Sequence, residues 1–89
     1  MGREEIEQNF ASAGWDLDGS FKDHLVIGYS SDGISLLAHK EWWGKDDPLF
    51  EILDHEEMIT YWVREVPTPE QAQELLGEHG HQPQEWDQP

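Results

Sequence analysis

Histidine side chains titrate closest to neutral pH, so acid–base or metal chemistry in this sequence would use them first. The chain contains five, and these are His24, His39, His55, His79 and His81. His24 and His39 fall on the two arms of a predicted β-hairpin, where they come close enough to share a ligand. No third ligand is apparent on the same face, so a structural role for both is the alternative. A small histidine-based metal- or ligand-binding protein is therefore one functional hypothesis.

Other motifs typical of catalytic sites are incomplete or missing. His55 and Glu56 begin like the H-E-x-x-H motif of zinc proteases, but Ile59 stands where the second histidine should be. A glycine-rich phosphate loop and a G-x-S-x-G nucleophile motif do not occur. Among twenty acidic residues, neighbouring carboxylates are expected by chance and do not indicate an acid–base pair. We therefore predict a protein that is not an enzyme and uses no cofactor.

The acidic residues carry the strongest functional signal. Twenty Asp and Glu against five Lys and Arg give a formal net charge of −15, which is extreme for 10.3 kDa. Such a charge repels nucleic acid and anionic membranes, so we expect neither as a direct partner. It attracts a basic protein surface and accelerates association with it. The alternative is that the acidity only keeps the protein soluble or reflects an acidic proteome.

Two adjacent tryptophans lie beside some of these acids. In a strand, Trp42 and Trp43 point to opposite faces, so one of them is expected near the surface. A surface tryptophan beside acidic residues is typical of an interface that meets a basic partner. The predicted partner-binding residues are Glu41, Trp42, Trp43, Asp46 and Asp47. The alternative is that helices cover both faces of the sheet and bury both indoles.

A β-hairpin over residues 24–43 must position these side chains. Two runs rich in β-branched and aromatic residues flank Asp32 and Gly33, a pair that favours a two-residue type I′ turn. That turn places Tyr29 opposite Leu36. A ribbon of two strands is marginal alone, so the flanking segments must cover it.

The segment before the hairpin predicts an N-terminal helix over residues 3–13. Ile6, Phe10 and Ala13 form one apolar stripe at helical spacing. Gly14 is well placed to end the helix.

The segment after the hairpin predicts a strand over residues 49–53 and then a less certain element. For residues 54–66 we favour a helix, because Asp54 and Glu57 are spaced as a capping box. An apolar face at helical spacing also supports the helix, and it comprises Met58, Ile59, Trp62, Val63 and Val66. The alternative is a further strand over residues 58–66, which the β-branched and aromatic residues there favour.

A second C-terminal helix has clearer signals. Thr68 can serve as N-cap, Pro69 as the first helical residue and Gln71 as the reciprocal capping partner. Gly77 or Gly80 would end it. The rest of the chain is polar, so we expect a single small domain over residues 1–78 and a flexible C-terminal tail over residues 79–89.

The sequence therefore predicts a small α+β domain with an antiparallel sheet centred on the 24–43 hairpin, an N-terminal helix and two C-terminal helices. It has no cysteine and no long apolar run, so we expect a cytoplasmic protein. The main functional hypothesis is a non-catalytic acidic module that binds, and inhibits, a positively charged protein, in the manner of an immunity protein or nucleic-acid mimic. An accessory subunit of a larger assembly is the alternative. The sequence leaves the oligomeric state open.

Overall fold

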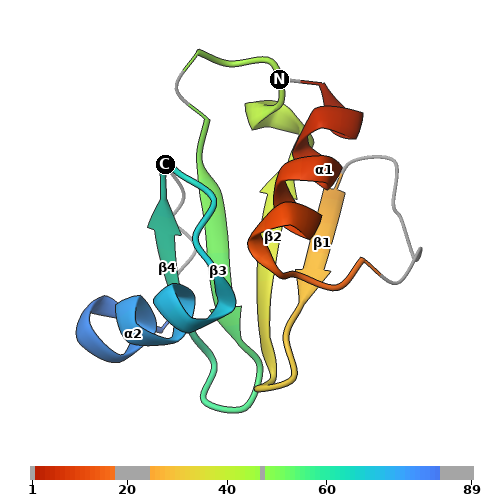
Figure 1. The fold of residues 1–89 in the computed structure, drawn as a ribbon. Coiled ribbons are helices and arrows are strands. Elements are labelled where there is room, and N and C mark those ends of the chain that lie inside the picture. The colour runs from red at the N-terminus through yellow and green to blue at the C-terminus, as the bar shows by residue number, and fades with distance from the viewer. Residues whose placement is uncertain (1, 18–24, 47, 83–89) are drawn as a thin grey trace.

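The computed structural model describes residues 2–17, 25–46 and 48–82, which form one antiparallel sheet and two α-helices. The sheet order is β1-β2-β3-β4 (Figure 1). The elements in chain order are α1 (Arg3–Ala13), β1 (Leu25–Tyr29), β2 (Ile34–His39), the 3₁₀ helix η1 (Lys40–Trp42), β3 (Phe50–Asp54), β4 (Ile59–Val63) and α2 (Pro69–His79). The predicted α+β class and antiparallel sheet are confirmed. The prediction of two C-terminal helices is wrong, because α2 is the one α-helix in the described chain after β4.

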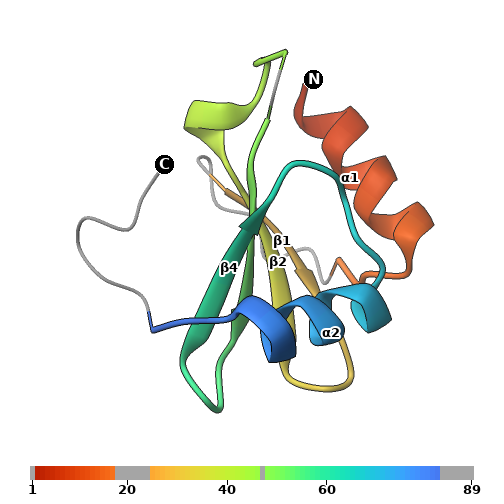
Figure 2. The same ribbon diagram turned by 90° about the vertical axis from the view of Figure 1, so that its left-hand side faces the viewer.

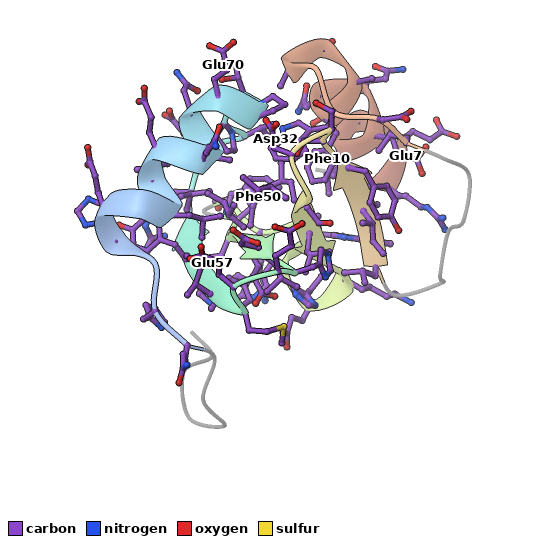
Figure 3. The ribbon with its side chains drawn as sticks, turned by 90° about the horizontal axis from the view of Figure 1, so that it is seen from below. Glu7, Phe10, Asp32, Phe50, Glu57 and Glu70 are labelled. Carbon is purple, nitrogen blue, oxygen red and sulfur yellow. The ribbon has the colours of Figure 1, made fainter. Side chains whose placement is uncertain are left out.

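Both helices pack on the same face of the sheet (Figure 2), here called the core face. The ring centroids of Phe10 from α1 and Phe50 from β3 lie 5.9 Å apart in an edge-on contact. Figure 3 shows both rings inside, while Glu7 and Glu70 lie on the outer sides of their helices. The rest of the buried apolar cluster comprises Ile6, Trp15, Val26, Ile34, Leu36, Ala38, Ile52, Ala72 and Leu76. This one core stabilises the fold through burial of apolar surface.

The predicted N-terminal helix is confirmed with its bounds. Gly14 follows α1 with a φ of 104°, a left-handed conformation that glycine adopts without steric cost. The next residue, Trp15, is buried, and its indole Nε1 donates to the Pro67 carbonyl oxygen at 2.7 Å. That hydrogen bond joins the end of α1 to the segment that leads into α2.

The helix α2 also begins as predicted. The Thr68 hydroxyl accepts a hydrogen bond from the Gln71 backbone N–H at 3.1 Å, and the Gln71 side chain accepts one from the Thr68 N–H at 3.0 Å. This is the reciprocal capping box. Pro69 is the first helical residue, and Gly80 follows the last.

The predicted helix over residues 54–66 is wrong, and the alternative of a further strand is correct in type. Residues 55–58 form a turn between β3 and β4. Asp54 does accept hydrogen bonds from the Glu56 and Glu57 N–H groups, but Met58 then adopts a positive φ of 54° and stops any helix. The β-branched and aromatic residues of β4 instead pair with β3, and this non-local pairing decides the outcome.

The hairpin is confirmed, but its predicted register is wrong by one residue. The Ser30 N–H donates to the Ile34 carbonyl oxygen, so the loop has three residues, with Gly33 at a φ of 78°. Tyr29 therefore faces Ser35, and Leu36 faces Gly28. A slip of one residue exchanges the two faces of a strand. The core face thus receives the more apolar set of β2 residues.

An isolated β-bridge pairs one backbone position on each outer edge of the sheet. Asp16 pairs with Tyr29 beside β1, and His81 pairs with Thr60 beside β4. His79, which was expected to begin the tail, is the last residue of α2. The described fold thus extends to His81, and residues 83–89 of the predicted tail lie outside the described residues.

Two glycine substitutions should change the free energy of unfolding in opposite directions. A Cβ at Gly28 would lie 2.7 Å from the Trp15 Cβ and 3.1 Å from Phe10 Cδ2, whereas a Cβ at Gly77 meets nothing within 4 Å. We expect Gly28→Ala to lower the free energy of unfolding by about 1–3 kcal/mol through overpacking. Gly77→Ala should raise it by about 0.5–1 kcal/mol, because alanine favours the helix. Urea unfolding measures both, and a neutral Gly28→Ala would contradict this packing.

Candidate functional site

The predicted partner-binding residues lie at the end of β2, but not in a strand. The strand ends at His39, and Lys40–Trp42 form η1. The premise that Trp42 and Trp43 alternate across a strand is therefore wrong. The described pairing of β2 with β1 ends at Leu25 and His39, so Lys40–Trp42 are not held in the extended conformation by a neighbouring strand. We call residues 40–46 the η1 loop.

Trp43 holds the η1 loop against the body of the protein. Its indole Nε1 donates to the Ala38 carbonyl oxygen at 3.0 Å. The half-buried ring packs against the core cluster, and the Arg3 guanidinium carbon lies 5.9 Å from the ring centroid. This distance is within the range of a cation–π interaction. Trp43 thus connects the η1 loop to both β2 and α1.

Trp42 differs from its neighbour in one respect. Its ring is half-buried, and its indole Nε1 is buried with no hydrogen-bond partner among the described residues. A buried donor without a partner costs about 1–3 kcal/mol. Glu41 and Asp46, on the same loop, are exposed. Asp47, the fifth predicted residue, lies outside the described residues.

A polar network occupies the second face of the sheet, away from the helices. His39 Nε2 donates to Glu51 Oε1 at 3.0 Å. The Thr60 hydroxyl lies 2.9 Å from Glu51 Oε2 and 2.8 Å from the Ile52 carbonyl oxygen. The His39 and Trp62 rings lie 5.5 Å apart. The network joins β2, β3 and β4.

Sequence reasoning missed this network for two reasons. The predicted register placed His39 beside His24, and the predicted helix removed Thr60 and Trp62 from the sheet. The period-two pattern of β4 was the available signal, because it places Thr60 and Trp62 on the same face. His24 lies outside the described residues, so its expected proximity to His39 stays a prediction. Within the described part of the chain, no group of three or more potential ligands could hold a metal ion.

A serine and a histidine also come together. Ser35 Oγ and His55 Nε2 lie 2.8 Å apart, which resembles the nucleophile–base contact of a hydrolase. Ser35 is only 1% exposed, however, and a substrate cannot approach a hydroxyl that is buried to this extent. The contact holds the β3–β4 turn against β2. We interpret it as structural.

A groove lies between β4 and α2. It encloses about 600 Å³ and is bordered by β4, residues 64–67 and one side of α2. Three acidic residues line it, namely Glu65, Glu74 and Glu78. All three are exposed, and they give the β4–α2 groove a negative wall.

The acidic residues are distributed over the whole described surface. Each acid that the structure describes is exposed or half-buried, and none belongs to the core. Exposed acids occur on both helices, on both hairpin turns and on the η1 loop. The negative charge therefore surrounds the molecule and includes the η1 loop and the β4–α2 groove.

No helix in the described ranges combines the length and apolar character needed to cross a bilayer. Comparisons of the chain with family models, with curated proteins and with solved structures give no match.

The two tryptophans of the η1 loop provide a matched test of their indole N–H groups. Both Trp→Phe substitutions remove one N–H and a similar ring volume. Trp43→Phe also loses the hydrogen bond to Ala38, whereas Trp42→Phe removes a buried donor without a described partner. We expect Trp43→Phe to destabilise the fold by about 1–2 kcal/mol more than Trp42→Phe does in urea unfolding. Equal losses would mean that the Trp42 N–H already has a partner.

Proposed function

We propose that this protein is a non-catalytic acidic interaction module that binds, and inhibits, a positively charged protein. The contact residues are Glu41, Trp42, Trp43, Asp46 and Asp47. The observation that carries the proposal is the half-buried indole of Trp42 on a loop with exposed carboxylates. A partner that contacts the exposed part of this ring and carries positive charge matches both features.

The overall charge supports a cationic partner. A net charge of −15 on a chain whose described acids all lie outside the core produces a strong negative potential around the molecule. Such a potential guides a basic protein toward the surface and repels acidic ones. A basic protein that binds nucleic acid presents the matching surface, because it is built to neutralise phosphates. Occupation of that surface would inhibit it.

Trp42 supplies the short-range part of the interaction. Interface energy is concentrated in a few residues, among which tryptophan is enriched. Trp43 fixes the loop through Ala38 and Arg3, so little conformational freedom is lost when the partner binds. The two tryptophans thus have different main roles. Trp43 positions the loop, and Trp42 makes the central contact with the partner.

One observation favours the alternative of an accessory subunit. The second face of the sheet carries half-buried apolar side chains and is not packed against either helix, and these side chains include Leu25, Ile27, Leu53 and Trp62. A subunit of a larger assembly would bury such a face without any need for charge. Under this alternative, substitutions that neutralise the η1 loop leave the affinity unchanged.

Substitution of Trp42 tests the proposed contact. A protein captured by the immobilised chain from its native cells is purified, and its binding is measured by calorimetry. We expect Trp42→Ala to weaken binding by about 30-fold or more, because it removes a central aromatic contact. Met58→Ala is the control, since Met58 is a large exposed apolar residue on a different turn. Wild-type affinity for Trp42→Ala would contradict the proposal.

A pair of double variants tests the position of the charge. Glu41→Gln with Asp46→Asn and Glu56→Gln with Glu57→Gln each remove two negative charges, so their net charges are equal. At about 50 mM salt we expect the first pair to weaken binding by about fivefold to tenfold, because its charges adjoin Trp42. The second pair should have a smaller effect. Equal effects would show that the partner responds only to total charge and does not contact the η1 loop.

A further inference from the structure

The outer edge of β4 is only partly paired. The Thr60 N–H donates to the His81 carbonyl oxygen at 2.8 Å, and the His81 N–H donates to the Thr60 carbonyl oxygen at 3.0 Å. Both backbone groups of Thr60 therefore point away from β3. Alternate residues of a strand direct these groups to the same side, so the N–H and C=O of Trp62 also point outward.

The chain's own return segment does not reach Trp62. The bridge between Thr60 and His81 is antiparallel, so the residue in register with Trp62 is His79. His79 is the last residue of α2 and is helical. Within the described residues, the outward backbone groups of Trp62 therefore have no strand partner. An edge of this kind is a template for an added strand.

The open edge borders the β4–α2 groove. Tyr61 and Val63 line one side of the groove, and Leu75 lines the other, so an extended peptide would find apolar contacts there. Around these apolar residues stand Glu65, Glu74 and Glu78, against the single base Arg64. The groove therefore combines a backbone edge with a net negative wall. This combination selects a peptide that is extended and basic.

We propose that the β4–α2 groove binds an extended lysine- or arginine-containing segment of the cationic partner, which adds to the outer edge of β4 as a further strand. This inference rests on the proposed function, because it takes the positive charge of the partner from there. Backbone hydrogen bonds to Trp62 give the segment its register, and Glu74 and Glu78 contact its basic side chains.

This site and the η1 loop are close enough for one partner to occupy both. The Trp62 ring lies 5.5 Å from the His39 ring, and His39 directly precedes η1. A partner whose strand adds to β4 is therefore brought to the η1 loop, where it meets Trp42.

A designed peptide pair tests the mode of binding. One hexapeptide alternates lysine and valine, and the second has the same sequence with a methyl group on every backbone nitrogen. Methylation removes the hydrogen-bond donors and keeps the charge. Binding to the full chain is followed by amide chemical shifts. We expect the unmethylated peptide to shift the Trp62 amide and to bind about tenfold more tightly than the methylated one. Equal affinity, or an unshifted Trp62 amide, would overturn the inference.

Matched double variants of the protein test the charge of the groove. Glu74→Gln with Glu78→Gln and Glu4→Gln with Glu5→Gln remove the same net charge from α2 and α1, respectively. We expect the α2 pair to weaken binding of the unmethylated peptide about fivefold more than the α1 pair. Equal weakening would overturn the inference, because it would place the peptide outside the groove.

The peptide results are separable from the proposed function. If the peptide fails these tests while Trp42→Ala still weakens the captured partner, strand addition is wrong and the acidic module stands. If Trp42→Ala has no effect on that partner, the proposed function fails whatever the peptide does.

Discussion

The fold depends on one constraint, which is that two helices must cover a four-stranded sheet and both lie on the same face (Figure 2). The contact between Phe10 and Phe50 joins α1 to the middle of the sheet, and the hydrogen bond from Trp15 to Pro67 joins the end of α1 to the start of α2. The buried apolar cluster of the described chain lies between the helices and this face of the sheet. The second face is stabilised differently, by hydrogen bonds among His39, Glu51 and Thr60.

This arrangement explains how so acidic a chain can fold. The core takes its side chains from apolar residues alone, so no described carboxylate has to be buried in it. Glu51, which is 15% exposed at its side chain, is hydrogen-bonded by His39 and Thr60, as a largely buried carboxylate requires. Most of the other described acids lie on helices, turns and the η1 loop. The repulsion among them is reduced by water and salt.

The sequence predicted those parts of the fold that local signals determine. Gly14 marked the end of α1, and Thr68, Pro69 and Gln71 marked the start of α2. The register of the first hairpin was not predictable from Asp32 and Gly33, because a three-residue loop with Gly33 in the left-handed conformation satisfies the same residues. Residues 54–66 had a helical period, but β4 gains its stability from pairing with β3. Whether such a segment becomes a helix or a strand therefore depends on its pairing within the assembled sheet.

The sequence predicts a binding role for residues 41–47, which stays a prediction, but it does not predict the geometry of these residues. The sequence indicated the η1 loop through its adjacent tryptophans and acids, but the roles of Trp42 and Trp43 differ only because Trp43 reaches the Ala38 carbonyl. The open edge at Trp62 was not predictable, because it depends on the return of His81 to Thr60 across the end of α2.

The most direct test of the proposed binding to a cationic partner is the association rate constant as a function of ionic strength. It is measured by stopped flow with the full chain and the captured partner. Between about 0.02 and 0.3 M salt, we predict that the rate constant falls by at least about tenfold while dissociation changes little. An association rate constant that does not vary over this range would contradict the account.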